Sequence, residues 1–152
     1  MTRAPFQVLV YPYRHTPGGQ LEVAVLKRAD AGFWQGIAGG GEDTETPLEA
    51  AIRETFEESG IPTTSEFIQL DTIESIPVTE FRDSALWGED TYVIPQYSFG
   101  VKAENATIVL SREHTEVVWV STAEALTLIK YDGNKTALWE LHQRLKGKGP
   151  RG

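Results

Sequence analysis

The strongest constraint on the fold is a helix whose two ends are both marked in the sequence. Thr46 is a typical N-cap, Pro47 suits the first helical position, and Glu49 completes a capping box. Gly60 supplies a left-handed C-cap, and Pro62 prevents the helix from continuing. The sequence therefore predicts a helix of four turns between these caps, and any fold must accommodate its two faces.

The residues of this helix separate into an acidic face and an apolar face. Unpaired carboxylates three and four residues apart destabilise a helix by roughly a few tenths of a kcal/mol per pair. The last turn also lies at the negative end of the helix dipole. A hard divalent cation with oxygen ligands would neutralise such carboxylates, and a solvated acidic face is the alternative. The acidic face comprises Glu54, Glu57 and Glu58, and the apolar face comprises Leu48, Ala51, Ile52, Thr55 and Phe56.

The overall composition is that of one ordinary globular domain. The chain has 152 residues, 40% of them apolar, and this suits a single domain over residues 1–146 with a disordered tail at 147–152. The absence of cysteine excludes a disulfide framework, a thiolate metal site and a cysteine nucleophile. No apolar run approaches the roughly 20 residues of a membrane span, and the N-terminus lacks a signal-peptide core. We therefore expect a cytoplasmic protein with no membrane partner.

The net charge of −8 is concentrated in one segment. Residues 42–58 include seven acidic side chains and Arg53 as the single basic one. Because phosphate backbones recruit basic surfaces, the charge argues against duplex nucleic acid as a partner. A calcium-binding loop is also disfavoured, since Asp43, Glu45 and Glu49 lack the spacing of such loops.

The remaining segments alternate between strand and helix patterns. Residues 29–41 are glycine-rich and are predicted to form a loop with at most a short strand at 34–37, and residues 79–90 are predicted to form a second loop. Strands before and after one strong helix, with helices closing the chain, indicate an α+β fold with a mixed sheet covered on both faces. The predicted strands are 6–13, 21–26, 67–78, 91–102, 107–110 and 116–121, and the two closing helices are 122–129 and 134–145.

The acidic helix and the glycines before it match a known motif. Gly39, five residues, Glu45, seven residues, and then Arg53-Glu54-Thr55-Phe56-Glu57-Glu58-Ser59-Gly60-Ile61 resemble the Nudix box over 23 positions, with every charged and glycine position present. Thr55 stands where the motif has an aliphatic residue, which is a packing position outside the ligand set. The chain resembles a complete Nudix domain from about residue 6 to residue 145.

This resemblance implies an α/β/α sandwich that hydrolyses a nucleoside diphosphate linked to another group. The cofactor would be Mg²⁺ or Mn²⁺, with more than one ion. Arg53 and Glu45 would pair to hold the loop and the helix in register, and Gly39 and Gly60 would be structural. By the same resemblance the metal ligands would be Glu54, Glu57, Glu58 and the carbonyl of Ala38, and the catalytic residues would include Glu57, Glu58 and Arg53.

A further carboxylate is expected just before the last strand. Many Nudix hydrolases place a glutamate there that reaches back to the metal centre as a ligand or general base. Glu113 and Glu116 are the candidates, and Glu113 is favoured over Glu116. An exposed loop carboxylate is the alternative for Glu113, and His114 is expected to be a structural hydrogen-bonding residue.

Scattered positions resemble the branch that contains bacterial dihydroneopterin triphosphate pyrophosphatases and their dATP-cleaving relatives. Trp34 would stack on a planar ring, although a core aromatic residue is an equal alternative. Lys27 and Arg28 would hold phosphates, a solvated surface pair being the alternative. The predicted substrate-binding residues are Lys27, Arg28, Trp34, Gly39, Gly40 and Asn134.

The leading hypothesis from the sequence is therefore a metal-dependent pyrophosphohydrolase of a nucleoside or pterin triphosphate. The enzymatic alternative is a hydrolase of ADP-ribose, a nucleotide sugar or a dinucleoside polyphosphate. A non-catalytic nucleotide-sensing Nudix module is disfavoured, because such modules commonly lose the box carboxylates. The expected partner is a small phosphorylated molecule, and a homodimer is left open because Nudix domains often dimerise.

Overall fold

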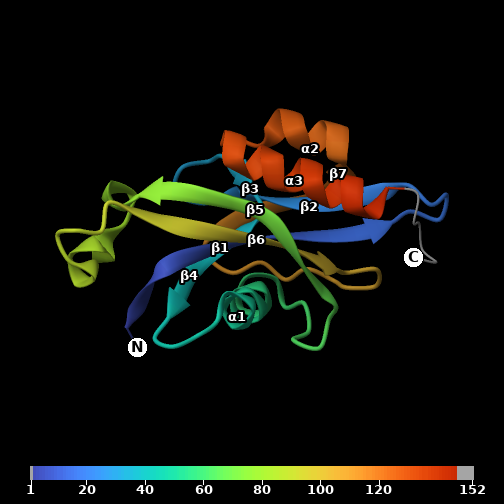
Figure 1. The fold of residues 1–152 in the computed structure, drawn as a ribbon. Helices are drawn as coiled ribbons and strands as arrows, with labels where there is room; N and C mark the ends of the chain where they lie inside the picture. Colours follow the sequence, from blue (N-terminus) through green and yellow to red (C-terminus); the bar gives the residue numbers. More distant parts are fainter. Residues whose placement is uncertain (1, 147–152) are drawn as a thin grey trace.

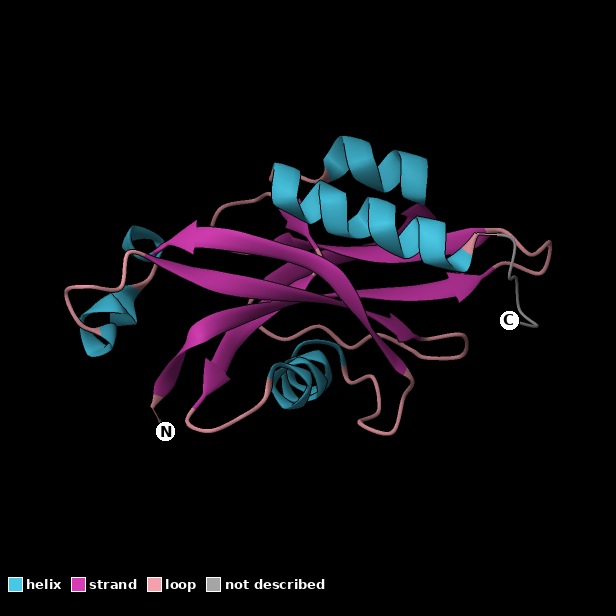
Figure 2. Ribbon diagram, in the orientation of Figure 1, coloured by secondary structure: helices cyan, strands magenta, loops and turns pink. Residues whose placement is uncertain are grey.

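The computed structural model describes residues 2–146, which fold into a twisted sheet with helices on both faces (Figure 1). One helix lies under the sheet and two lie side by side over it, as Figure 2 shows. The tail expected at 147–152 lies outside the described residues. The strands are β1 (Arg3–His15), β2 (Leu21–Arg28), β3 (Trp34–Gln35), β4 (Ile37–Glu42), β5 (Phe67–Pro77), β6 (Val93–Lys102) and β7 (His114–Ser121), and the α-helices are α1 (Pro47–Ser59), α2 (Thr122–Leu128) and α3 (Asp132–Leu145).

The sheet is mixed, as expected from the sequence. Its seven strands run in the order β3-β2-β1-β6-β5, with β4 paired to β1 and β7 paired to β2. The central pair of β1 and β6 is parallel, and the other pairs are antiparallel. The N-terminal part of β1 pairs with β4, whereas its C-terminal part pairs with β2. Strands β2 and β4 therefore diverge on the same edge of β1, and α1 follows β4 in the chain.

Alternation along the central strands divides the core into two layers. On β1, Val8 and Val10 face α1, whereas Leu9 and Tyr11 face α2 and α3, and all four are fully buried. Strand β2 alternates in the same way. The α+β architecture with a mixed sheet covered on both faces is therefore confirmed.

Helix α1 begins and ends where the sequence predicts. The Thr46 hydroxyl accepts a hydrogen bond from the Glu49 backbone N–H, the Glu49 carboxylate accepts one from the Thr46 N–H, and Gly60 has a φ of 74°. The predicted apolar face is wrong in part, because Leu48 is 42% exposed and Phe56 is 53% exposed. Small side chains let the helix approach the sheet closely, so the buried face consists of Ala50, Ala51, Thr55, Glu58 and Ser59.

The glycine run is a strand and not the predicted loop. Gly39 and Gly40 pair with Val8 and Gln7 of β1. Side chains lie directly on the strand, since a Cβ at Gly39 would overlap the Glu54 carboxylate and one at Gly40 would overlap the Arg3 guanidinium. Pattern rules assign glycine to loops because it has low strand propensity, but here glycine makes room for the charged groups above β4.

Two further predictions along the chain need correction. The strand expected at 107–110 does not form, because this segment runs along the end of α1, where the Val109 N–H donates to the Ser59 carbonyl. The loop expected at 79–90 contains two short 3₁₀ helices, η1 (Val78–Glu80) and η2 (Arg82–Trp87). Within residues 2–146, no helix is both long and apolar enough to cross a membrane.

Candidate active site

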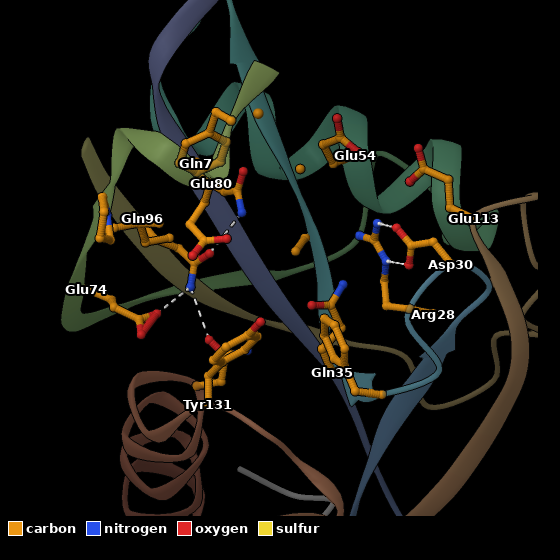
Figure 3. A pocket seen from close by; sticks show the side chains of 18 of the residues that line it. Gln7, Arg28, Asp30, Gln35, Glu54, Glu74, Glu80, Gln96, Glu113 and Tyr131 are labelled. Carbon is orange, nitrogen blue, oxygen red and sulfur yellow. Dashed lines mark hydrogen bonds and ion pairs between the residues drawn. The ribbon is translucent and has the colours of Figure 1, made fainter. Parts of the chain in front are cut away.

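A cavity of about 620 Å³ opens between β4, the end of β5 and the N-terminus of α3 (Figure 3). Its walls combine the carboxylates of Glu54 and Glu113 at one end with amide and aromatic side chains and the Glu74 carboxylate at the other. Such a division suits a ligand with one charged and one planar part. The lining includes the acidic residues Glu54, Glu74 and Glu113, the basic residues Arg3 and Arg28, the amides Gln7, Gln35, Gln96 and Asn134, and the aromatic residues Phe33, Phe81 and Tyr131.

Arg53 ties the acidic helix to the glycine strand. Its guanidinium donates to both carboxylate oxygens of Glu45, at 2.8 and 3.0 Å, and to the Gly40 carbonyl at 2.8 Å. It also donates to Glu54 at 2.9 Å and to Glu57 at 2.7 Å. The predicted contact between Arg53 and Glu45 is therefore present. Five hydrogen bonds from one guanidinium fix the position of β4 relative to α1.

Glu58 belongs to a second cluster, beside the segment that precedes β7. The Ser111 hydroxyl donates to Glu58 Oε2 at 2.8 Å, and Nδ1 of the buried His114 lies 3.2 Å from the same oxygen. Burial by itself would raise the pKa of Glu58, but its contacts with His114 and Ser111 lower the pKa below the usual value. His114 is buried within ion-pair distance of this carboxylate, but neither of its ring nitrogens makes a hydrogen bond within residues 2–146, so the hydrogen-bonding role expected for it is not seen.

Two carboxylates at the cavity are hard to ionise. Burial raises the pKa of Glu54 to about 7, even though Arg53 donates to this carboxylate. Partial burial and the neighbouring charge of Glu58 raise the pKa of Glu113. Carboxylates with raised pKa values at one end of a cavity are typical of sites that receive a cation.

The donor chemistry fits a hard divalent ion. Glu54, Glu113 and Ala38 line the cavity, and Glu58 adjoins Glu113. These groups supply oxygen ligands, which Mg²⁺ and Mn²⁺ prefer. In residues 2–146, however, no three acidic or histidine side chains are gathered closely enough to hold an ion as they stand.

Glu54 and Glu57 lie on the same side of α1, because both accept hydrogen bonds from Arg53 Nη1, but the two carboxylates differ in exposure. Glu57 is half-exposed and turns toward Arg53, outside the cavity lining. Glu54 and Glu58 are four residues apart and their side chains are 14% and 7% exposed, so these two lie on the covered side of the helix. The placement of Glu57 is set by its ion pair with Arg53 one turn earlier.

Of the predicted phosphate ligands, Arg28 lines the cavity and Lys27 does not. Arg28 donates to both carboxylate oxygens of Asp30, at 3.1 and 2.7 Å, and Lys27 lies 3.9 Å from Glu116. Alternate residues of β2 point to opposite faces, and this separates the two neighbours.

Arg3 is a second cation at the cavity, and no pattern in the sequence indicates this position. Its guanidinium donates to Gln7 and lies over the rings of Phe81 and Trp87. Among the described residues it has no carboxylate within 4.0 Å. A lone arginine near the N-terminus is indistinguishable in sequence from a surface charge, and only the pairing of β1 with β4 brings it to the site.

The predicted stacking role of Trp34 is wrong, because this residue does not line the cavity. Trp34 packs into the core beneath α2 and α3, so it is a core aromatic residue, and its neighbour Phe33 lines the cavity instead. Asn134 also lines the cavity, as do Gly39 and Gly40. The amides of Gln35 and Gln96 were missed, although a glutamine within an otherwise apolar strand is a signal that a buried polar network exists.

Comparison with known proteins identifies relatives of the whole domain. The family model described as NUDIX domain matches residues 6–141. The chain is 30% identical over 119 residues to the dihydroneopterin triphosphate diphosphatase of Haemophilus influenzae, covering 76% of this chain and 75% of that protein. It is 33% identical over 126 residues to the asymmetrical bis(5'-nucleosyl)-tetraphosphatase of Mus musculus, covering 82% and 81%.

A solved structure agrees over nearly the full length. A protein from Listeria monocytogenes described as a NUDIX hydrolase superposes with a TM-score of 0.85 at 41% identity, covering 95% of this chain and 97% of that one. These proteins share one domain type and one fold, and the names of the two relatives state different substrates.

Proposed function

Because this chain belongs to the Nudix family and is a Nudix hydrolase, we propose that it is a metal-dependent pyrophosphohydrolase of a triphosphate. The substrate would be a nucleoside or pterin triphosphate, of the dATP or dihydroneopterin triphosphate type, cleaved by attack of water. The bacterial relative named for dihydroneopterin triphosphate supports this choice.

One observation carries the proposal: the box carboxylates and the planar-ring side chains line one continuous cavity. Glu54 and Glu113 lie at one end and Tyr131 lies at the other (Figure 3), where the Phe33 ring packs against it. A triphosphate would reach the carboxylates while its ring contacts the aromatic side chains. A cavity with only the acidic end would suit inorganic polyphosphate equally well.

The cofactor would be Mg²⁺ or Mn²⁺, and more than one ion. Glu54, Glu58 and Glu113 with the carbonyl of Ala38 would hold the ions, and Glu57 would join them only if it released Arg53. Bound divalent ions neutralise phosphate charge and lower the pKa of water, which is the chemistry that anhydride cleavage needs.

Three arginines and one glutamate at the acidic end of the cavity would have different roles in this reaction. Arg53 holds the Glu54 carboxylate in place, and Arg28 and Arg3 offer positive charge to the phosphates. Glu113 would accept the proton of the attacking water, because its raised pKa brings it closer to neutral pH than an ordinary glutamate.

A dinucleoside polyphosphate is the second candidate substrate. The observation that favours it is the similarity to the mouse protein named bis(5'-nucleosyl)-tetraphosphatase, at 33% identity over 82% of this chain. Product analysis separates the two candidates. A triphosphate substrate releases inorganic pyrophosphate, whereas a dinucleoside polyphosphate yields two nucleotides.

The test is a screen for release of pyrophosphate or of nucleotide products over a panel of nucleoside and pterin triphosphates, nucleotide sugars and dinucleoside polyphosphates, with Mg²⁺ and with Mn²⁺. We expect metal-dependent turnover of a triphosphate, and a loss of kcat by two orders of magnitude or more in Glu58→Gln. Circular dichroism verifies that the variant is folded. Wild-type turnover in Glu58→Gln, or no turnover of any triphosphate, would overturn the proposal.

A further inference from the structure

The end of the cavity away from Glu113 is built around a carboxylate, Glu74, on β5. Figure 3 shows Glu74, Gln96 and Tyr131 on one side of the cavity, and Arg28 and Glu113 on the other. We call Glu74, Gln96, Asn134, Phe33 and Tyr131 the ring end. The side chains of Gln96 and Asn134 are nearly inaccessible there, since these residues are only 4% exposed.

The amide of Gln96 holds Glu74 in one orientation. Gln96 Nε2 donates to Glu74 Oε2 at 3.1 Å and to Asn134 Oδ1 at 3.2 Å, and Gln96 Oε1 accepts from Gln7 Nε2 at 3.2 Å. Both amide hydrogens are therefore used, and the carbonyl is occupied as well. Gln96 therefore positions the Glu74 carboxylate, and both residues line the cavity.

Glu74 keeps free acceptor capacity. Its Oε1 receives no hydrogen bond within residues 2–146, and no basic side chain of that range lies within 4.0 Å of the carboxylate. The same oxygen, Glu74 Oε1, lies against Gly133 in the first turn of α3, where a Cβ would overlap it. A partly buried carboxylate without a cation retains strong affinity for N–H donors.

Aromatic side chains beside this carboxylate form a wall of the cavity, and Lys130 Nζ lies over both rings, 5.1 and 5.3 Å from their centroids. Phe33 and Tyr131 contact each other edge to face, with ring centroids 5.4 Å apart and an interplanar angle of 84°. Both line the cavity, and Tyr131 is 44% exposed. Stacking on such a wall accepts any flat heterocycle, so selectivity among heterocycles must come from the polar groups.

We propose that Glu74 is the specificity-determining residue, which accepts two adjacent N–H groups from a 2-amino-4-oxo pyrimidine edge. Guanine and pterins share this edge, in which a ring N–H stands beside an exocyclic amine. Adenine presents an unprotonated ring nitrogen at the matching position, whose lone pair would face the carboxylate. A buried acceptor left facing a lone pair is strongly disfavoured, so the site selects against adenine.

This inference rests on the proposed triphosphate hydrolysis, and the experiment separates the two. We would measure kcat/KM of the wild-type protein with Mg²⁺ for guanosine, inosine, adenosine and dihydroneopterin triphosphates. Inosine lacks only the 2-amino group. We expect guanosine or dihydroneopterin triphosphate to exceed both inosine and adenosine triphosphate by tenfold or more. The better of the two preferred substrates distinguishes a guanine nucleotide from a pterin as the source of the edge.

Glu74→Gln removes one of the paired acceptors while keeping the side-chain shape. We expect the guanosine-to-inosine ratio to fall toward one in this variant. The matched control is Glu80→Gln, because Glu80 is an exposed carboxylate at the same cavity and makes no hydrogen bond to Gln96. It should keep the wild-type ratio.

The wild-type comparison alone decides the inference if Glu74→Gln does not fold. Hydrolysis of all four triphosphates with kcat/KM values within twofold would overturn the role of Glu74 and leave the proposed function standing. An unchanged ratio in folded Glu74→Gln would also overturn it. No hydrolysis of any triphosphate would instead contradict the proposed function.

Discussion

At the scale of single residues, the site depends on Gly39, which leaves room for the Glu54 carboxylate at the cavity. A Cβ at Gly39 would overlap the Glu54 side chain. We expect Gly39→Ala to push that carboxylate aside and to lower kcat/KM at least tenfold, with metal present. The matched control is Gly18→Ala, where the nearest atom to a new Cβ is 3.8 Å away in a surface turn. Equal activity in Gly39→Ala and the wild type would show that Glu54 does not need its present position.

A second prediction concerns the one box position that departs from the family pattern. Thr55 is fully buried on α1, and its hydroxyl has no hydrogen-bond partner among residues 2–146. Thr55→Val keeps the shape and removes the unpaired hydroxyl, so we expect a stability gain of about 1 kcal/mol. Urea unfolding measures it. Thr55→Ala is the control, because it also removes the methyl group and should destabilise the protein.

The residues that could be predicted are those whose chemistry depends on spacing along one element. The caps of α1 follow from such spacing, whereas the contact of Arg53 with Glu45 follows from the resemblance to the Nudix box. Two residues are too few to show by their pattern which side chain of β3 faces the cavity. The sequence therefore predicts Trp34 at the cavity, where the structure has its neighbour Phe33. Arg3 and Glu74 were missed because pairing between distant strands brings them to the site.

At the scale of elements, α3 is fastened to β5 by one glutamate. Glu140 accepts hydrogen bonds from the backbone N–H groups of Asp71 and Thr72, from the Thr72 hydroxyl and from Arg144. Burial alone would raise the pKa of Glu140, but these hydrogen bonds lower it to about 2. The Glu140 side chain is 15% exposed, so solvent screens the contacts only weakly.

Because the pKa of Glu140 is lowered in the folded state, its contribution to stability depends on pH in a defined way. Its contribution is present above the ordinary glutamate pKa of 4.5 and is lost as the pH falls toward about 2. We expect Glu140→Gln to cost about 1 to 2 kcal/mol at pH 7. The difference from the wild type should shrink between pH 5 and pH 2, as measured by urea unfolding at each pH.

The control is Asp71→Asn, since Asp71 also pairs with Arg144, at 3.1 Å, but its side chain is 93% exposed. We expect about 0.5 kcal/mol or less from this exposed pair. A larger loss in Asp71→Asn than in Glu140→Gln would mean that the surface ion pair, and not the clamp on the strand backbone, holds α3 to β5.

Elements with their own end signals were predicted well, and elements defined by pairing were not. Helix α1 carries both caps in its sequence, so its bounds were predicted closely. Strand β4 consists largely of glycine, which has low intrinsic strand propensity, and it exists because β1 offers hydrogen bonds along its edge. The segment 107–110 has strand-forming residues but meets the end of α1 instead of a free strand edge.

At the scale of the whole molecule, six of the eight net negative charges come from residues 42–58, the segment that includes α1. Within the cluster, Arg53 is shared among Glu42, Glu45, Glu54 and Glu57, so one cation serves four carboxylates. Glu58 and Glu113 receive no arginine or lysine within 4.0 Å in the described part of the chain. The folded protein therefore keeps an electrostatic cost that bound divalent ions would relieve.

This imbalance predicts that Mg²⁺ stabilises the folded state even without substrate. For a dissociation constant on the order of 1 mM, 10 mM Mg²⁺ would add about 1.4 kcal/mol and raise Tm by about 3 to 6 °C. Thermal unfolding should be compared with KCl at equal ionic strength, because general screening also relieves repulsion. A specific site predicts a larger rise with Mg²⁺, and loss of that excess in Glu54→Gln with Glu58→Gln. Equal rises in both salts would show that screening alone acts, and that the carboxylates of α1 bind no ion until substrate phosphates supply further oxygens.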